Sequence, residues 1–165
     1  MNGKVHLASG ILIATGTATP YLNLYPGATM ACTGVYGLAC IVGAIFADID
    51  SRTSMLGKRM FFLRFWQKGK DHRMLITHTP VFAIGSSVIL AITGYEAAAV
   101  GWLVGDLLHL MLDTLTTGGI RWGWPVSRKF VSFRHAASGS SFDAFWMILI
   151  VIVMIRIAWA VKEFF

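Results

Sequence analysis

The sequence has few charged residues and few cysteines, and both shortages narrow the class of protein. Only 13% of its 165 residues are Asp, Glu, Lys or Arg, and 56% are hydrophobic, whereas a soluble domain carries about a quarter charged residues. This excludes an ordinary soluble domain and predicts a single integral membrane domain over residues 1–165. Cys32 and Cys40 lie in one apolar segment, too far apart along a helix to bridge, so no disulfide framework is predicted.

Several enzyme motifs are also missing. The sequence has no G-x-S-x-G elbow, no P-loop and no H-E-x-x-H motif. The first apolar run opens at Val5 with almost no charged region before it and lacks a clear small-residue cleavage site. We therefore expect a retained helix there and not a signal peptide.

Five apolar segments are candidates for membrane-crossing helices. They cover residues 5–19, 28–47, 75–94, 97–115 and 144–161. A spanning helix needs about 20 apolar residues, so the first and fourth, which are short or interrupted by polar groups, are expected to be tilted or partly covered by protein. We predict an all-α helical bundle with about five transmembrane helices. Gly34, Gly37 and Gly43, with Ala39, predict a small-residue face for close helix packing.

The charge of the connections predicts the orientation in the membrane. Residues 51–74 hold seven Lys and Arg and residues 116–142 hold four, whereas 20–27 and 94–96 hold none. Both basic connections fall on one side, which the positive-inside rule makes cytoplasmic, in a multi-pass protein of the bacterial inner membrane. The basic and aromatic stretch "MLGKRMFFLRFWQKGK" fits either a segment lying in an anionic leaflet or a solvated loop. The bilayer is the predicted partner, and no specific nucleic acid is, because the cations lie in loops at a membrane face.

Residues able to bind a metal or move protons lie near the ends of the predicted helices. Because successive helices cross the membrane in opposite directions, these ends all come to the same membrane face. Taken singly, most fit a helix cap, a hydrogen-bonded pair or an interfacial residue. Together they indicate a functional site, because ionisable groups at membrane depth cost several kcal/mol unless they are paired. The candidates are His6, Asp48, Asp50, His72, His78, Asp106, His109, Asp113, His135 and Asp143.

The chemistry of this set predicts a divalent metal site. Imidazole and carboxylate ligands suit Zn²⁺ or another divalent ion. The carboxylates outnumber what one tetrahedral zinc needs, which indicates two or more ions with a bridging Asp. Arg73, next to His72, either binds a phosphate through a bidentate fork or is one more cytoplasmic charge.

The polar residues fall within motifs that occur in order along nearly the whole chain: His6, "ADIDS", "HRMLITHT", "GDLLHLMLDTLTTGGIRWGWP" and "SGSSFD". This set resembles the LexA-regulated, inner-membrane metal-dependent hydrolases of the YdjM type. That family is distantly similar to the zinc-dependent phospholipase C and P1-type nuclease group, which implies an all-α fold, a zinc cluster and phosphoester hydrolysis. Ala47 stands where the family usually has Pro, and the spacing from His72 to His78 is one residue longer than usual, which favours His78 over His72.

The resemblance also implies roles for individual residues. His109 and Asp113 match the H-x-x-x-D ligand pair of the larger group. The other implied ligands are His6, Asp48 or Asp50, His72 or His78, and Asp143. We expect a metal-dependent hydrolase acting on a phosphoester of a lipid or membrane-proximal substrate at the cytoplasmic face. Asp106 is expected to orient a ligand or act as general base, and Arg73 to bind the anionic group.

Two other classes of function remain open. A metal ion or proton transport protein would use the same residues as a permeation site and would place polar groups at several depths. A non-catalytic membrane protein with a structural metal would have a closed set of ligands.

Overall fold

The chain folds into an all-α bundle, as the apolar segments predicted. The computed structural model describes residues 3–50, 76–133, 141, 143, 145–150 and 152–153, and the structural statements that follow concern these residues. The elements are α1 (Gly3–Leu24), α2 (Met30–Phe46), η1 (Ala47–Asp50), η4 (Ile76–His78), α3 (Pro80–Ile92) and α4 (Glu96–Thr114). The described residues from 141 to 153 are helical as well.

Two of the helical segments are long and apolar enough to cross a membrane. They are Met30–Ile49, which includes α2 and the start of η1, and Glu96–Thr114, which is α4. Helix α3 is apolar but has 13 residues, fewer than the about 20 that a span along the bilayer normal needs. The structure therefore confirms an all-α bundle of about five helices, two of which are long candidate spans. That all five cross the membrane stays a prediction.

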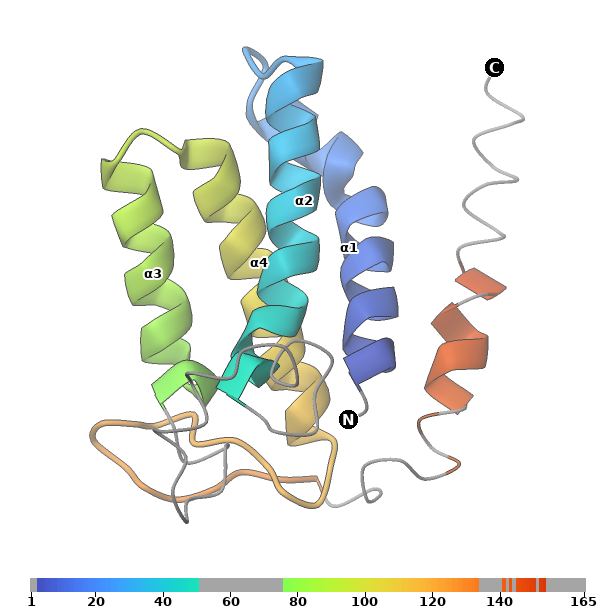
Figure 1. Cartoon of the computed structure of the whole chain (residues 1–165), viewed down its shortest axis with the longest axis vertical. Helices are drawn as coiled ribbons and strands as arrows, with labels where there is room; N and C mark the ends of the chain where they lie inside the picture. The colour runs from blue at the N-terminus through green and yellow to red at the C-terminus, as the bar shows by residue number, and fades with distance from the viewer. Residues whose placement is uncertain are drawn as a thin grey trace.

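Short connections make neighbouring helices antiparallel. Thr29 caps α2 by accepting a hydrogen bond from the Cys32 backbone N–H at 3.2 Å, and Thr79 caps α3 in the same way. Gly94 adopts a φ of 86° in the tight turn between α3 and α4, a conformation that glycine adopts without a steric penalty. The beginnings of α1 and α3 and the ends of α2 and α4 consequently lie at one end of the bundle (Figure 1).

Helices α2 and α4 approach until their backbones touch. A Cβ atom added to Gly105 would meet the carbonyl oxygen of Cys40, and one added to Gly101 would meet the carbonyl oxygen of Tyr36. A Cβ atom at Gly43 would lie 2.6 Å from the carbonyl oxygen of Trp102. Only glycine fits at such contacts, so these residues set the distance between the two helices.

The predicted small-residue face of α2 is correct in part. Gly43 touches α4, and the Ala39 side chain lies 3.0 Å from a Cβ position built on Gly101. Gly37 faces α1, where the nearest atom is the Ala14 Cβ at 4.0 Å, and Gly34 has nothing within 4 Å. Gly34 is therefore not a packing residue among the described contacts, because it is exposed on the surface of α2.

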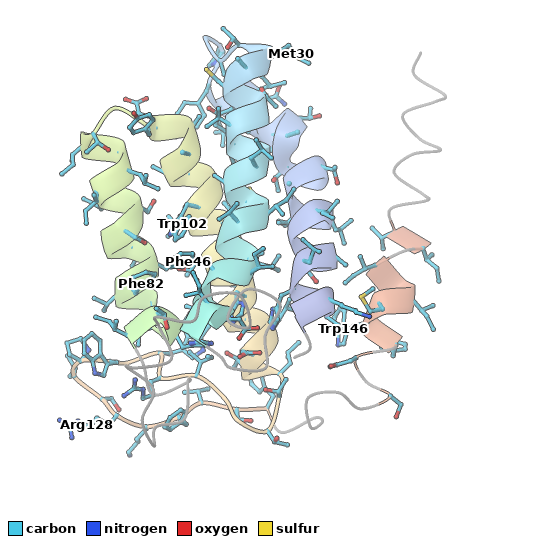
Figure 2. All side chains as sticks on the ribbon, viewed as in Figure 1. Met30, Phe46, Phe82, Trp102, Arg128 and Trp146 are labelled. Carbon is cyan, nitrogen blue, oxygen red and sulfur yellow. The ribbon has the colours of Figure 1, made fainter. Side chains whose placement is uncertain are left out.

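Helix α3 is held to α4 by aromatic packing and two hydrogen bonds. The Phe46 ring lies 4.8 Å from Trp102 and 6.1 Å from Phe82, measured between ring centroids (Figure 2). The Trp102 indole N–H donates to Ser86 Oγ at 2.8 Å, and Ser87 Oγ donates to the Ala99 carbonyl at 2.6 Å. Both serine hydroxyls are thereby satisfied inside an apolar interface.

Residues 115–133 form a hairpin-like segment that crosses the end of the bundle where α4 finishes (Figure 1). Ile120 and Val131 pair through two backbone hydrogen bonds, and the Phe133 N–H donates to the Thr114 carbonyl. Trp122 donates its indole N–H to Thr114 Oγ1 at 2.8 Å. It therefore fastens this segment to α4.

The described part of the last helix packs on α1 and α4. Ile150 forms one buried cluster with Val5 and Leu112, and Trp146 packs against the same cluster. This places a further helix beside the end of the bundle where α1 begins (Figure 2).

We predict that Gly105→Ala destabilises the protein, because its methyl group would overlap the Cys40 carbonyl. Overpacking of this kind costs about 1–3 kcal/mol, so the thermal midpoint in detergent should fall by several degrees. Gly34→Ala is the matched control, since nothing lies within 4 Å of its Cβ position and alanine is the better helix former. An equal loss of thermal midpoint in both variants would contradict the packing described here.

Candidate metal centre

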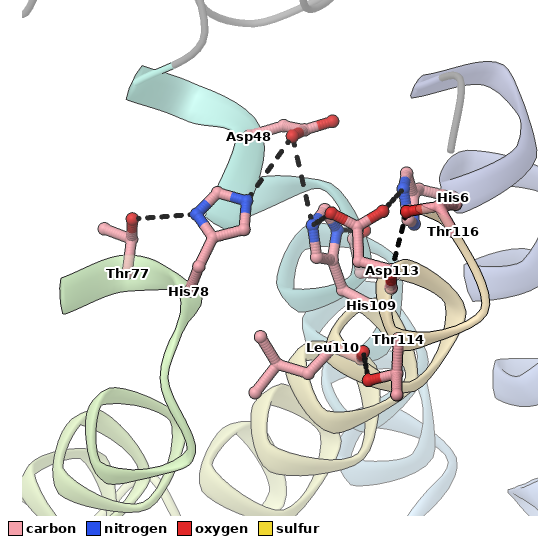
Figure 3. Close-up of polar contacts among 10 residues, drawn as sticks. His6, Asp48, Thr77, His78, His109, Leu110, Asp113, Thr114 and Thr116 are labelled. Atoms are coloured by element: carbon pink, nitrogen blue, oxygen red, sulfur yellow. Dashed lines mark hydrogen bonds and ion pairs between the residues drawn. The ribbon is translucent and has the colours of Figure 1, made fainter. Parts of the chain in front are cut away.

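Five of the predicted site residues lie together at one end of the bundle (Figure 3). His6 comes from the first turn of α1, Asp48 from η1, His78 from η4, and His109 and Asp113 from the last turns of α4. Four separate segments of the chain thus contribute side chains to one cluster. The convergence predicted from helix alternation is confirmed for these five.

The donor atoms of these residues are within a few ångströms of one another. His6 Nε2 lies 3.3 Å from Asp113 Oδ1, and His109 Nε2 lies 3.9 Å from Asp113 Oδ2. Asp48 Oδ1 lies 3.7 Å from His78 Nε2 and 3.9 Å from His109 Nε2. Two overlapping ligand groups result, His6–Asp48–His109 and His78–His109–Asp113, each with all its donor atoms within 4.8 Å.

The orientation of His109 is fixed by the backbone of α2. Its Nδ1 lies 2.8 Å from the carbonyl oxygen of Ala44, and because a carbonyl only accepts, Nδ1 must carry the proton. In the neutral ring the lone pair is then on Nε2, which lies 3.9 Å from an oxygen of Asp48 and 3.9 Å from an oxygen of Asp113. A hydrogen bond of this type, which sets the tautomer and the ring orientation, usually accompanies metal-ligating histidines.

The other two imidazoles pack against His109. The His6 ring stacks on it with centroids 3.9 Å apart and an angle of 18°, and the His78 ring meets it edge-on at 5.4 Å and 71°. His78 Nδ1 also lies 3.3 Å from Thr77 Oγ1. All three rings are therefore held by neighbours before any ligand is considered.

The cluster is almost completely removed from solvent. The side chains of His6, His78, His109 and Asp113 are at most 2% exposed, whereas that of Asp48 is 13% exposed. Burial lowers the pKa of His78, although its contact with Asp48 acts in the opposite direction. His78 is thereby kept in the neutral form that binds metal.

The donor set fits a divalent cation. His6 Nδ1 and His109 Nε2 are buried and have no hydrogen-bond partner among the described residues. Leaving a buried polar atom unsatisfied costs about 1–3 kcal/mol, a cost that a bound cation would remove. Three imidazoles and two carboxylates are ligands that Zn²⁺ and similar ions take.

Asp106 and Asp143 are buried but belong to neither ligand group. Asp106 lies one turn before His109 on α4, and neither of its carboxylate oxygens has a hydrogen-bond partner among the described residues. Asp106 therefore makes no side-chain hydrogen bond to another helix in the described part of the chain. Asp143 lies in the helical segment that follows the hairpin.

The remaining candidates lie outside what the structure describes. Asp50 ends η1, but its side chain is not among the described ones. His72, Arg73 and His135 fall in residues 51–75 and 134–140, which the structure does not describe. Their predicted roles stay predictions.

Sequence reasoning did not identify the Ala44 carbonyl, which orients His109. A backbone carbonyl can accept a hydrogen bond whatever the side chain is, so the residue type at position 44 does not reveal this role. The related feature in the sequence is Gly105, one turn before His109, which lets α4 approach close enough for the hydrogen bond to form.

Comparison with known proteins agrees with these motifs. A family profile described as "YdjM inner membrane protein" matches residues 1–164. The chain belongs to this family. The resemblance carried by the sequence motifs is thus confirmed over the full chain, and the protein is located in the inner membrane.

One curated relative of this YdjM-family protein is YvsG of Bacillus subtilis (strain 168), described as an uncharacterized protein. The two are 28% identical over 129 residues, which cover 76% of this chain and 74% of the relative. No solved structure matches the chain.

We predict that Zn²⁺ raises the thermal midpoint of metal-stripped wild-type protein and does so much less in Asp113→Asn. An ion that binds only the folded state stabilises it by about 2.7 kcal/mol at 100 times its dissociation constant. Asp143→Asn is the matched variant, because it neutralises another buried carboxylate that is in neither ligand group. If Asp143→Asn also abolishes the shift in midpoint, Asp143 is a ligand, as the sequence motifs imply.

Proposed function

We propose that this YdjM-family protein is a metal-dependent hydrolase that cleaves a phosphoester of a lipid or another membrane-proximal substrate. The observation that carries the proposal is the convergence of five nitrogen and oxygen donor side chains, four of them buried, from four segments of the chain. Structural stability alone does not require this arrangement, because buried ionisable groups at membrane depth are costly.

In this proposal the metal ligands are His6, Asp48, His78, His109 and Asp113. The two ligand groups share His109, whose Nε2 can bind only one ion because its Nδ1 donates to Ala44. We therefore propose one ion centred on His109 for the described donors. The second ion expected from the number of carboxylates would need further ligands, for which Asp50, His72 and Asp143 are the candidates.

A divalent cation bound here would supply a Lewis acid that lowers the pKa of a water molecule and polarises a phosphoryl oxygen. The residues of the chain then hold and orient the reacting groups. Asp48, with the most exposed of the five donor side chains, is proposed to lie where substrate enters. Asp106 is proposed to orient a ligand or take up a proton, and Arg73 to bind the anionic group.

The proposed site faces the cytoplasm. Among the described residues, every Lys and Arg lies either at the start of α1 or in the hairpin, at the same end of the bundle as the cluster; they are Lys4, Arg121, Arg128 and Lys129. Positive charge marks the cytoplasmic side of inner-membrane proteins. With five membrane-crossing helices, this orientation would place the C-terminus on the opposite side.

A second candidate is a structural metal site without catalysis. Four of the five donor side chains are at most 2% exposed, and five ligands leave at most one open position on a six-coordinate ion. Structural metal sites are closed in this manner, whereas catalytic sites keep a position for water or substrate. Metal content and hydrolysis must therefore be measured on the same preparations.

We predict that purified wild-type protein contains about one divalent ion per chain and hydrolyses a phosphoester. The measurements are elemental analysis and product release from phospholipid, prenyl-phosphate and nucleotide panels. His109→Ala should lose both the ion and the activity, because His109 belongs to both ligand groups. His135→Ala, which removes an imidazole to which the motifs assign no role, should keep both.

The outcomes separate the candidates. Wild-type protein free of metal would exclude both the enzyme and the structural-metal site. Metal lost in His109→Ala, with no hydrolysis by the wild type across the three panels, would favour a structural metal.

We predict that Asp106→Asn keeps the metal but loses about a hundredfold or more in turnover, the range found for general acid–base groups. The carboxamide has nearly the same volume, so folding and metal content should not change. The limb of the pH–rate profile contributed by the carboxyl group should also disappear. Unchanged turnover with an unchanged pH profile would remove Asp106 from the proposed mechanism.

A further inference from the structure

A groove of about 630 Å³ opens at the end of the bundle opposite the histidine and aspartate cluster. It lies between the α1–α2 connection, the first turns of α2 and the start of α4, near the upper end of the bundle in Figure 1. Three tyrosines and one carboxylate provide its polar side chains, and small or apolar residues provide most of the rest. The residues that matter for the argument are Tyr21, Tyr25, Tyr95, Glu96, Ala31 and Val35.

The first wall of the groove is held in place by aromatic packing. The ring of Tyr21, which is 6% exposed, stacks on Tyr36 with centroids 4.4 Å apart and an angle of 13°. The Tyr36 hydroxyl lies within hydrogen-bond distance of Thr17 Oγ1, at 2.6 Å. Tyr25 packs against Tyr21 at 5.0 Å, and its backbone N–H donates to the Tyr21 carbonyl.

The opposite wall is fixed by the turn between α3 and α4. The Tyr95 backbone N–H donates to the Leu90 carbonyl at 2.9 Å, and Ala99 donates to the Tyr95 carbonyl at 2.8 Å. Glu96 follows as the first residue of α4. Both walls therefore exist before a ligand arrives, which lowers the entropic cost of binding.

The charge of the groove selects a cation. Glu96 is the only acidic residue among the described ones at this end, and every described Lys and Arg lies at the other end. An acid in the first turn of a helix also interacts favourably with the helix dipole, but that role does not account for the three tyrosines that line the same groove. Tyrosine faces attract ammonium groups, and such attraction contributes about 0.5–2 kcal/mol.

The apolar surface beside the groove favours an amphiphilic ligand. The groove opens where two candidate spans, Met30–Ile49 and Glu96–Thr114, have their ends. Val35 is 44% exposed and Leu24, which also lines the groove, is 77% exposed, so apolar surface continues from the groove along the bundle. A lipid headgroup in the groove would leave its acyl chains beside this surface.

We propose that this groove binds the ammonium headgroup of a zwitterionic phospholipid from the leaflet opposite the metal centre. The ammonium group lies among Tyr25, Tyr95 and Glu96, and the lipid phosphate stays toward solvent, because no described basic side chain lines the groove to receive it. This site is separate from the proposed hydrolase centre and uses none of its residues.

Native mass spectrometry of the purified protein tests the proposal. The probes are phosphatidylethanolamine and phosphatidylglycerol with identical acyl chains, offered at equal concentration. We expect phosphatidylethanolamine to be retained about tenfold better, since only it carries an ammonium group. Glycerophosphoethanolamine, which has the headgroup without chains, should bind at least tenfold more weakly than the lipid.

Two pairs of variants locate the site. Glu96→Gln should reduce the preference about threefold, which is typical of an exposed ion pair, and Glu96→Asp should keep most of it. Tyr95→Leu should reduce the preference by a similar factor, whereas Tyr95→Phe keeps the ring and the binding. Both side chains are exposed, so the metal content of all four variants should match that of the wild type. Only Glu96→Gln should lower the thermal midpoint, and only slightly, because it removes a negative charge from the first turn of α4.

Equal retention of the two lipids by the wild type would overturn the proposal. A preference that survives both Glu96→Gln and Tyr95→Leu would place the lipid elsewhere and overturn it as well. Binding of glycerophosphoethanolamine as strong as that of the lipid would replace the lipid with a soluble amine. None of these outcomes depends on whether the metal centre is catalytic.

Discussion

The contact between the backbones of α2 and α4 is the constraint on which the rest of the structure depends. Because Gly105 has no side chain, α4 can approach the Cys40 carbonyl, and one turn later the Ala44 carbonyl comes within 2.8 Å of His109 Nδ1. That hydrogen bond fixes the tautomer of His109 and directs Nε2 toward the carboxylates. The same approach places Asp48, just beyond the end of α2, 3.9 Å from His109 Nε2. Helix packing and the geometry of the cluster are therefore two consequences of one contact.

Burial strengthens the attraction of the cluster for a cation. Donors in water would be satisfied by hydration, but here His6, His109 and Asp113 are nearly inaccessible, and His6 Nδ1 has no hydrogen-bond partner in the described part of the chain. Their attraction for a cation is consequently stronger than that of surface groups, because neither water nor salt screens it. Neutral imidazoles beside carboxylates are the form in which metal ligands act.

Much of this arrangement could be predicted from the sequence, because alternating helices leave few choices. Once α1 to α4 are recognised as apolar helices that run in alternating directions, His6, Asp48, His78 and His109 must come to the same end. What could not be predicted is which donor atoms meet. This depends on helix rotation and on the interhelix distance, set by Gly101 and Gly105, whose contacts are with backbone atoms that have no sequence signature. The tyrosine groove was not anticipated for the same reason, since its walls come from separate helices.

The part of the bundle between its two ends distinguishes a permeation path from a metal centre that is open to one face. A transported ion would need ligands along the way from Asp106 to Glu96, and among the described residues α2 and α4 close this interval with backbone contacts at Tyr36 and Cys40. The buried hydroxyl of Ser87 in this region donates to the Ala99 carbonyl and is already satisfied. A cation leaving the cluster toward the opposite face would lose its carboxylates and meet close-packed apolar surface, at a cost of several kcal/mol or more. The described residues thus fit a metal centre that exchanges with one face of the membrane better than they fit a permeation path.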